Sequence, residues 1–134
     1  MISKINHIGI AVNNIDDALQ LYARTLGLNV GAFEVVEEQK TRTAIVPVGD
    51  IKIELLEATD SESPIAKHIE RRGEGLHHLA FEVDNIESAL AELKNKEIRL
   101  IDEQPRRGVE DTSIAFLHPK ATGGVLLEVV QKKE

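Results

Sequence analysis

The stretch from Gly75 to Leu93, GLHHLAFEVDNIESALAEL, decides the fold, because its first part repeats an earlier part of the chain. The segment INHIGIAVNNIDDAL, which begins at Ile5, aligns with LHHLAFEVDNIESAL, which begins at Leu76, at one constant offset. The identical pairs are His7 and His78, Val12 and Val83, Asn14 and Asn85, Ile15 and Ile86, Ala18 and Ala89, and Leu19 and Leu90. A repeat of this length indicates two fused modules of half the chain each.

A second correspondence closes each half. IKIELL, from Ile51, and VLLEVV, from Val125, are both apolar runs typical of strands, and each contains one carboxylate, Glu54 or Glu128. The chain therefore carries two histidines and two glutamates in duplicate.

The periodicity predicts an α+β fold of two tandem βαβββ modules. Module one, at about residues 1–58, has expected strands at 5–12, 30–38, 41–48 and 51–57 and a helix at 15–26 that follows Asn14 and stops at Gly27. A linker helix is expected at about 63–73, with Ser63 as its N-cap and Pro64 in its first turn. Module two, at about residues 74–134, has expected strands at 76–83, 98–102, 112–117 and 125–131 and a helix at 86–96.

Strand alternation places the duplicated polar residues on one side. Ile8, Ile10 and Val12 share a face that the helix can cover, whereas His7 lies on the opposite face. By the same parity Glu54, His78 and Glu128 also turn away from the helices, so the four side chains are expected to line a central metal cleft. Two imidazoles and two carboxylates suit a borderline divalent ion, with Co²⁺ as first choice and Mn²⁺, Ni²⁺ or Zn²⁺ as alternatives. A six-coordinate ion would keep two positions open for water or substrate, as catalysis requires.

A structural interpretation competes with the metal site. His7 and His78 would then be core histidines, and the two glutamates would lie at sheet edges. An unpaired buried carboxylate costs several kcal/mol, however, and four coincident positions on related strands favour a site. The remaining histidines, His68, His77 and His118, are expected to be structural. Glu38 ends the second expected strand. It lies two residues after Val36 and so shares its face of the strand, which makes Glu38 a candidate base.

Length and composition restrict the function classes. The 134 residues suit a single compact domain. A net charge of −7 argues against broad binding to nucleic acid or to an anionic membrane, and scarce aromatic residues offer no stacking platform. No run is long enough to cross a bilayer, and no secretory signal is expected at the start. The absence of cysteine excludes disulfides and thiol catalysis and fits a cytoplasmic location.

The chain resembles the vicinal oxygen chelate (glyoxalase/bleomycin resistance) superfamily, whose members pair βαβββ modules around a divalent metal. Within it, the chain is similar to the methylmalonyl-CoA epimerase family. The HIGIAV segment at His7 is shared across the superfamily, whereas SPIAK from Ser63, GLHHLAFEV from Gly75 and FLHPKATGGVLLE from Phe116 are more specific. The resemblance covers nearly the whole chain.

The resemblance implies R/S epimerisation of methylmalonyl-CoA by metal-assisted removal of the alpha proton and reprotonation on the opposite face. It assigns His7, His78 and Glu128 as metal ligands, with Glu54 at the fourth position, where the family carries Gln or Glu. Glu38 and Glu128 would be the two acid/base groups. Lys40 stands where members of the family often have glycine, so the sequence does not decide how the chain bends after Glu38. The family also implies a homodimer.

Two alternatives remain open. A glyoxalase I type lactoylglutathione lyase would use a similar His and Glu set, but the FLHPKATGG loop does not resemble its counterpart. A non-catalytic protein that sequesters a hydrophobic ligand would need an aromatic crevice, which three Phe, one Tyr and no Trp supply poorly. The residues that hold the CoA moiety stay open as well; the basic candidates are Lys40, Arg71, Arg72, Arg106 and Arg107. Three further questions stay open: which metal is native, whether the site lies within one chain or is shared across a dimer, and whether related acyl groups are accepted.

Overall fold

The computed structural model describes residues 1–133, and the chain divides into two compact units. The continuous unit is His7–His77, and the discontinuous unit joins Met1–Asn6 to His78–Glu134. The chain passes from one unit to the other immediately before His7 and immediately before His78. Strands β1 (Ile2–Ala11) and β5 (Gly75–Val83) therefore contribute residues to both units. The expected module boundaries stay a prediction, because the two units are defined by contacts between residues and do not coincide with the two halves of the sequence repeat.

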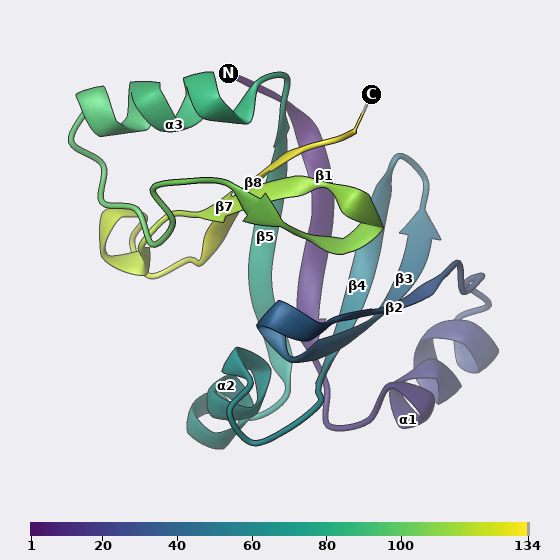
Figure 1. The fold of residues 1–134 in the computed structure, drawn as a ribbon. Helices are drawn as coiled ribbons and strands as arrows, with labels where there is room; N and C mark the ends of the chain where they lie inside the picture. Colours follow the sequence, from purple (N-terminus) through teal and green to yellow (C-terminus); the bar gives the residue numbers. More distant parts are fainter. Residues whose placement is uncertain (134) are drawn as a thin grey trace. The chain divides into compact units, whose positions relative to one another are not determined.

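In the continuous unit, the sheet order is β2-β3-β4-β1. The strands are β2 (Phe33–Val36), β3 (Thr41–Val48) and β4 (Ile51–Ala58). β1 runs parallel to β4, and the other neighbours are antiparallel. The four strands are labelled in Figure 1. Gly49, with a φ of 60°, makes the expected tight turn between β3 and β4.

Helix α1 (Ile15–Leu19) covers the apolar face of this sheet. It continues as a π-helix over Gln20–Thr25, in which the hydroxyl of Thr25 donates to the carbonyl of Gln20. The predicted extent to Leu26 is confirmed, but the wider second half was not anticipated. Its core contacts join Ile15 and Val46 to Leu55, which are all fully buried. Helix α2 (Pro64–Arg72) begins as predicted, with the hydroxyl of Ser63 accepting from the amide of Ile65.

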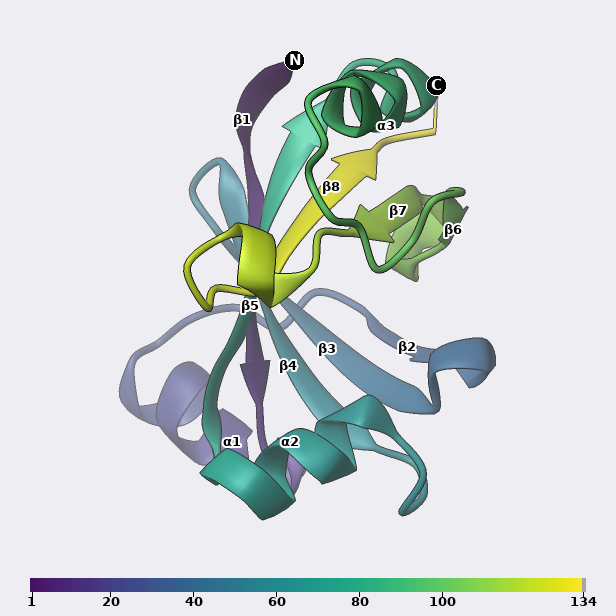
Figure 2. The same cartoon turned by 90° about the vertical axis from the view of Figure 1, so that its left-hand side faces the viewer.

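In the discontinuous unit, the sheet order is β1-β5-β8-β7-β6. The strands after β5 are β6 (Arg106–Arg107), β7 (Ser113–Phe116) and β8 (Leu127–Gln131). β5 runs parallel to β8, and β7 is antiparallel to β6 and β8. Helix α3 (Ile86–Asn95) packs on β7 and β8 through Leu90, Ala115 and Val129 (Figure 2). The same plan of parallel pair, hairpin and covering helix therefore occurs in both units.

The repeat extends to the hydrogen bonds that start the helices. The side chain of Asn14 accepts from the amide of Asp17, and that of Asn85 accepts from the amide of Ser88, both at 2.9 Å. The carboxylate of Glu57 accepts from the amide of Ile15 at 2.7 Å, and the carboxamide of Gln131 accepts from the amide of Ile86 at 2.8 Å. Each acceptor follows the duplicated glutamate of its strand by three residues. Each glutamate-bearing strand is thus tied to the first turn of its own helix.

Three expected elements differ from the prediction. The strand expected at 30–38 is regular only over β2, because Glu37–Gln39 form a 3₁₀ turn that Lys40 closes with a φ of 51°. The strand expected at 98–102 reduces to one bridge between Leu100 and Leu117. There the carbonyl of Phe116 accepts from the amides of both Ile101 and Asp102, which bends the chain.

The last strand also starts later than the expected residue 125. Gly123 and Gly124 precede it with φ values of 73° and 94°, and Val125 is 49% exposed, not packed inward. Two further 3₁₀ turns lie at Val109–Asp111 and Pro119–Ala121.

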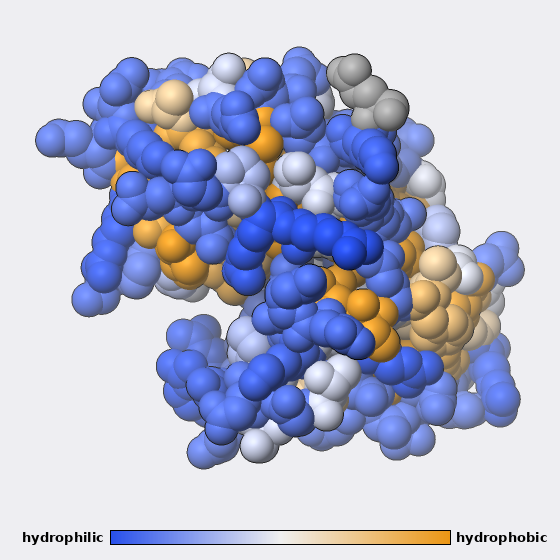
Figure 3. All heavy atoms as spheres, in the orientation of Figure 1, coloured by the Kyte–Doolittle hydropathy of each residue, from blue (hydrophilic) through white to orange (hydrophobic). Residues whose placement is uncertain are grey.

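The visible face of the molecule in Figure 3 is mostly hydrophilic, with hydrophobic residues in scattered patches. This agrees with the acidic composition and with exposed apolar side chains such as Phe33 and Val35 on β2. Within residues 1–133, no helix has the length and hydropathy needed to cross a membrane.

Candidate active site

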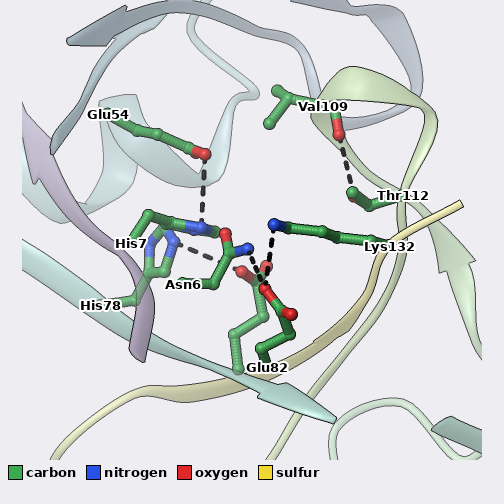
Figure 4. Close-up of polar contacts among 9 residues, drawn as sticks. Asn6, His7, Glu54, His78, Glu82, Val109, Thr112 and Lys132 are labelled. Carbon is green, nitrogen blue, oxygen red and sulfur yellow. Dashed lines mark hydrogen bonds and ion pairs between the residues drawn. The ribbon is translucent and has the colours of Figure 1, made fainter. Parts of the chain in front are cut away.

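The first histidine and glutamate form a pair in the continuous unit. In the parallel pairing of β1 with β4, Gly9 lies opposite Glu54, and His7 precedes Gly9 by two residues. Residues two apart on a strand share a face, so His7 and Glu54 project to the same side. Nδ1 of His7 lies 3.3 Å from Oε2 of Glu54, and each side chain is only 4% exposed (Figure 4).

The second pair, in the discontinuous unit, repeats this register. Ala80 of β5 lies opposite Glu128 of β8, and His78 precedes Ala80 by two residues. Nε2 of His78 lies 3.7 Å from Oε1 of Glu128, and both side chains are almost completely buried. The residues opposite the glutamates on the antiparallel side, Ile45 and Phe116, are apolar in both units. The sequence repeat is therefore a repeat of site geometry.

The small residues explain how each pair fits. Gly9 and Ala80 occupy the positions directly opposite the glutamates, where a large side chain on the same face would fill the space beside the carboxylate and the imidazole. In both units an imidazole nitrogen lies no more than 3.7 Å from a carboxylate oxygen that is buried. Burial of a carboxylate is costly unless a charged or hydrogen-bonding group, such as a metal ion, compensates for it.

The donor set fits a divalent metal ion. Imidazole nitrogen and carboxylate oxygen are the ligands of borderline metals, and His7, Glu54 and His78 are of the kinds that could hold one. As whole residues, all four of the predicted ligands are buried. Such burial suits ligands that are held in place rather than solvated.

Two residues near the pairs were not singled out from the sequence. The ring of Phe116 meets that of His78 edge-on, with 5.5 Å between centroids. Asn6 is a buried residue beside His7, and its amide donates to the carboxylate of Glu82, which also lies 3.6 Å from the ammonium of Lys132 (Figure 4). Its polar side chain, directly before His7 in the strand, was the available signal.

Glu38 is placed differently from the other predicted site residues. It lies in the 3₁₀ turn after β2 and is exposed, so its orientation follows this turn and not the strand parity used to predict it. Within residues 1–133, no hydrogen bond or ion pair joins Glu38 to His7 or Glu54. Lys40 supplies the bend after Glu38, with the left-handed backbone that glycine adopts most easily.

The other histidines make local contacts. The rings of His68 and His77 meet edge-on at 4.9 Å. Burial and the neighbouring His68 lower the pKa of His77 to about 4, and burial together with Arg72 and Arg71 lowers the pKa of His68. Nδ1 of His118 accepts from the amide of Lys120 and starts the 3₁₀ turn of that loop. Each has a structural contact, as expected.

The chain is similar to known proteins over nearly its whole length. Residues 6–116 match the family model of the Glyoxalase/Bleomycin resistance protein/Dioxygenase superfamily. The mitochondrial methylmalonyl-CoA epimerase of Bos taurus is 37% identical, over 97% of this chain and 75% of its own. The ethylmalonyl-CoA/methylmalonyl-CoA epimerase of Cereibacter sphaeroides is 35% identical, over 98% of this chain and 99% of its own.

Solved structures share the fold. A variant of Streptomyces coelicolor methylmalonyl-CoA epimerase in complex with 2-nitronate-propionyl-CoA superposes with a TM-score of 0.95 and 36% identity, covering 98% of this chain and 96% of its own. A methylmalonyl-CoA epimerase in complex with methylmalonyl-CoA and NH4+ has the same TM-score, identity and coverage. The expected glyoxalase-like fold is thereby confirmed.

Proposed function

The chain belongs to the Glyoxalase/Bleomycin resistance protein/Dioxygenase superfamily and, within it, to the methylmalonyl-CoA epimerases, and we propose that it inverts the alpha carbon of methylmalonyl-CoA by metal-assisted proton transfer. It is an isomerase that acts on an acyl-CoA thioester. The proposal rests on the two buried His–Glu pairs, which have the same strand register in both units. The relatives of this chain are epimerases.

By the family resemblance, His7, Glu54, His78 and Glu128 would hold one divalent ion. A bound ion would act as a Lewis acid toward the thioester and carboxylate oxygens of the substrate. We take Co²⁺ as the first candidate, with Mn²⁺, Ni²⁺ and Zn²⁺ as alternatives for the same nitrogen and oxygen donors.

Two carboxylates move the proton. Inversion requires one group to remove the alpha proton from one face and another to return a proton to the opposite face, each within about 3 Å of the carbon. Glu38 serves one face and Glu128 the other. Glu38 is exposed and so can exchange its proton with solvent, whereas Glu128 is buried beside His78 and would serve both as a metal ligand and as a proton acceptor.

The proposal is tested by proton NMR of metal-loaded protein with methylmalonyl-CoA in D₂O. We expect loss of the alpha-proton signal far above the rates without enzyme and with a chelator. A parallel sample with the glutathione hemithioacetal of methylglyoxal tests the lyase alternative. Metal-bound protein that exchanges no alpha proton of methylmalonyl-CoA but converts the hemithioacetal would contradict the proposal.

The role of Glu38 has a matched control in the same turn. Glu38→Gln should slow turnover by about a hundredfold or more, because a carboxamide cannot accept the proton. Glu37→Gln, at the neighbouring exposed glutamate, should retain the wild-type rate. Equal effects of the two substitutions on kcat would remove Glu38 from the mechanism.

Three finer features belong to this proposal. Ethylmalonyl-CoA is a second substrate to test, because one relative is named for both acyl groups. A homodimer is expected from family resemblance and is measured by sedimentation. A cytoplasmic location fits a chain without cysteine and is measured by cell fractionation.

A further inference from the structure

Arg106, in the discontinuous unit, is fixed in position by two contacts. Its Nε lies 3.1 Å from Oδ1 of Asp102, and its guanidinium carbon lies 5.6 Å from the centre of the Phe116 ring. The other oxygen of Asp102 accepts from the backbone amide of Phe116 at 2.9 Å. One carboxylate therefore holds both the arginine and the strand that carries the ring beneath it.

This arrangement connects Arg106 to the second His–Glu pair. Phe116 meets His78 edge-on, and it lies opposite Glu128 in the pairing of β7 with β8. Arg106 is thus separated from the imidazole of His78 by one aromatic ring. In strand register its counterpart in the other unit is Glu34, which pairs with Thr43 as Arg106 pairs with Ile114. The cation is therefore a feature of one half only.

The guanidinium keeps donors for a ligand. The ion pair with Asp102 engages Nε, and no other hydrogen bond or ion pair within residues 1–133 engages the two terminal nitrogens. The side chain is 43% exposed, whereas Asp102 is 15% exposed. A planar guanidinium held at Nε presents its terminal N–H groups as a fork, which matches the two oxygens of a carboxylate or phosphate.

The charge of the substrate class supplies the reason for such a group. An acyl-CoA with a malonyl head carries a carboxylate and several phosphate charges, while the chain has a net charge of −7. Neighbouring cations are engaged elsewhere: Nε of Arg107 lies 3.6 Å from Asp111, and the ammonium of Lys133 lies 2.7 Å from the same residue. A locally fixed cation offsets the long-range repulsion.

We propose that Arg106 binds an oxyanion of the acyl-CoA substrate through its two terminal nitrogens, while Asp102 and Phe116 hold it beside His78 and Glu128. The inference rests on the proposed function, because it takes the acyl-CoA as the ligand. The oxyanion belongs either to the malonyl carboxylate or to a phosphate of the CoA moiety, and the two sources are separable by choice of ligand.

The test compares Arg106→Ala and Arg106→Lys with Arg107→Ala, the adjacent exposed arginine, as the control. For Arg106→Ala we expect a KM for methylmalonyl-CoA that is higher by about tenfold or more, with kcat within about twofold, because a charge-assisted contact is lost. Arg106→Lys should give an intermediate KM, since lysine keeps the charge but lacks the fork. Arg107→Ala should retain the wild-type KM.

Two further ligands identify the oxyanion. Methylmalonyl-pantetheine lacks the phosphates, and propionyl-CoA keeps them but lacks the malonyl carboxylate. If Arg106 binds a phosphate, Arg106→Ala weakens propionyl-CoA binding, measured by calorimetry, and leaves the KM for the pantetheine ester unchanged. If it binds the carboxylate, the substitution raises the KM for the pantetheine ester and leaves propionyl-CoA binding unchanged.

Two results would overturn the inference with the proposed function intact. One is a wild-type KM in Arg106→Ala for every ligand. The other is a fall in kcat that follows a loss of bound metal, measured by elemental analysis, which would make Arg106 only a support for Phe116 and His78. If wild-type protein does not turn over methylmalonyl-CoA, the proposed function fails, and calorimetry with methylmalonyl-CoA, which carries both oxyanions, decides on Arg106. Weaker binding in Arg106→Ala supports the anion site, whereas no binding to wild type, or equal binding to both proteins, removes it.

Discussion

The two His–Glu pairs are built alike, whereas the two turns that precede β3 and β7 are not. Both pairs use a histidine two residues before a small residue that lies opposite the glutamate. Both turns are closed by a left-handed residue, Lys40 or Asp111, followed by a threonine. At the position that the constant offset gives for Glu38, however, the second turn carries Val109, which Glu110 follows. The repeat is therefore retained at the four candidate ligands and is not retained in these turns.

The largest effect on kcat should come from substituting Glu128, and the same substitution at Glu54 should have a smaller effect. Glu128→Gln is expected to lower kcat by about a thousandfold with the fold intact, because it removes both a ligand and a proton acceptor. Glu54→Gln should lower kcat by less than about tenfold, since a carboxamide oxygen still offers a ligand and the family carries Gln or Glu at this position. Steady-state rates and circular dichroism spectra measure both. Equal losses in the two variants would contradict the asymmetric role of Glu128.

The two histidines should be equivalent in metal binding. His7→Ala and His78→Ala are each expected to lose bound metal and the stabilisation that the metal provides. For the wild type, that stabilisation is about 2.7 kcal/mol when free metal is at a hundred times its Kd. Elemental analysis and thermal unfolding, with and without chelator, measure these changes. A melting temperature of the wild type that ignores both chelator and added metal would count against a site shared by the two pairs.

The helix-capping acceptors give a smaller and symmetric test. Glu57→Ala and Gln131→Ala should each lower the free energy of unfolding by about 1 kcal/mol, because the first amide of α1 or α3 loses its acceptor. Glu57→Gln copies the residue of the second half and should cost less than Glu57→Ala. Its ion pair with Arg42, at 4.0 Å and partly exposed, adds little. Urea unfolding measures the three variants; a Glu57→Gln protein as unstable as Glu57→Ala would assign the effect to charge.

The smallest effect concerns pH and comes from His68, whose ring meets that of His77 in the continuous unit. The pKa of His68 is lowered by burial and by Arg72 and Arg71, so below about pH 6.5 the unfolded chain takes up this proton before the folded chain does. Stability contributed by the neutral ring is therefore present above that pH and is lost as the pH falls. His68→Gln should make stability less sensitive between pH 7.5 and 5.5, measured by urea unfolding of metal-free protein. An unchanged slope would show that His68 does not contribute.

Sequence pattern predicted the elements that repeat with clear periodicity. β3 and the start of α2 were placed at the observed residues, because alternation, a serine cap and a proline in the first turn are local signals. The four ligand candidates were also found from the sequence, since parity on a strand places a side chain on a face. Their burial and ion-pair contacts agree with that interpretation.

Other features depended on contacts that sequence pattern does not encode. The turn at Glu37–Gln39 and the left-handed Lys40 ended β2 early, although the residues suit a strand. β6 consists of two arginines and forms because β7 offers a free edge. The role inferred for Arg106 required knowing that Asp102 and Phe116, far apart in sequence from His78, meet in one unit.

The position of Met1–Asn6 has a consequence for synthesis of the chain. The continuous unit is complete once His77 has left the ribosome, whereas the first six residues belong with a segment made afterwards. Ser3 and Asn6 both bond to Glu82, across more than half of the chain. Contacts of this sequence separation form slowly. Residues 1–6 are therefore made before the continuous unit but reach their partners only after the second half has emerged.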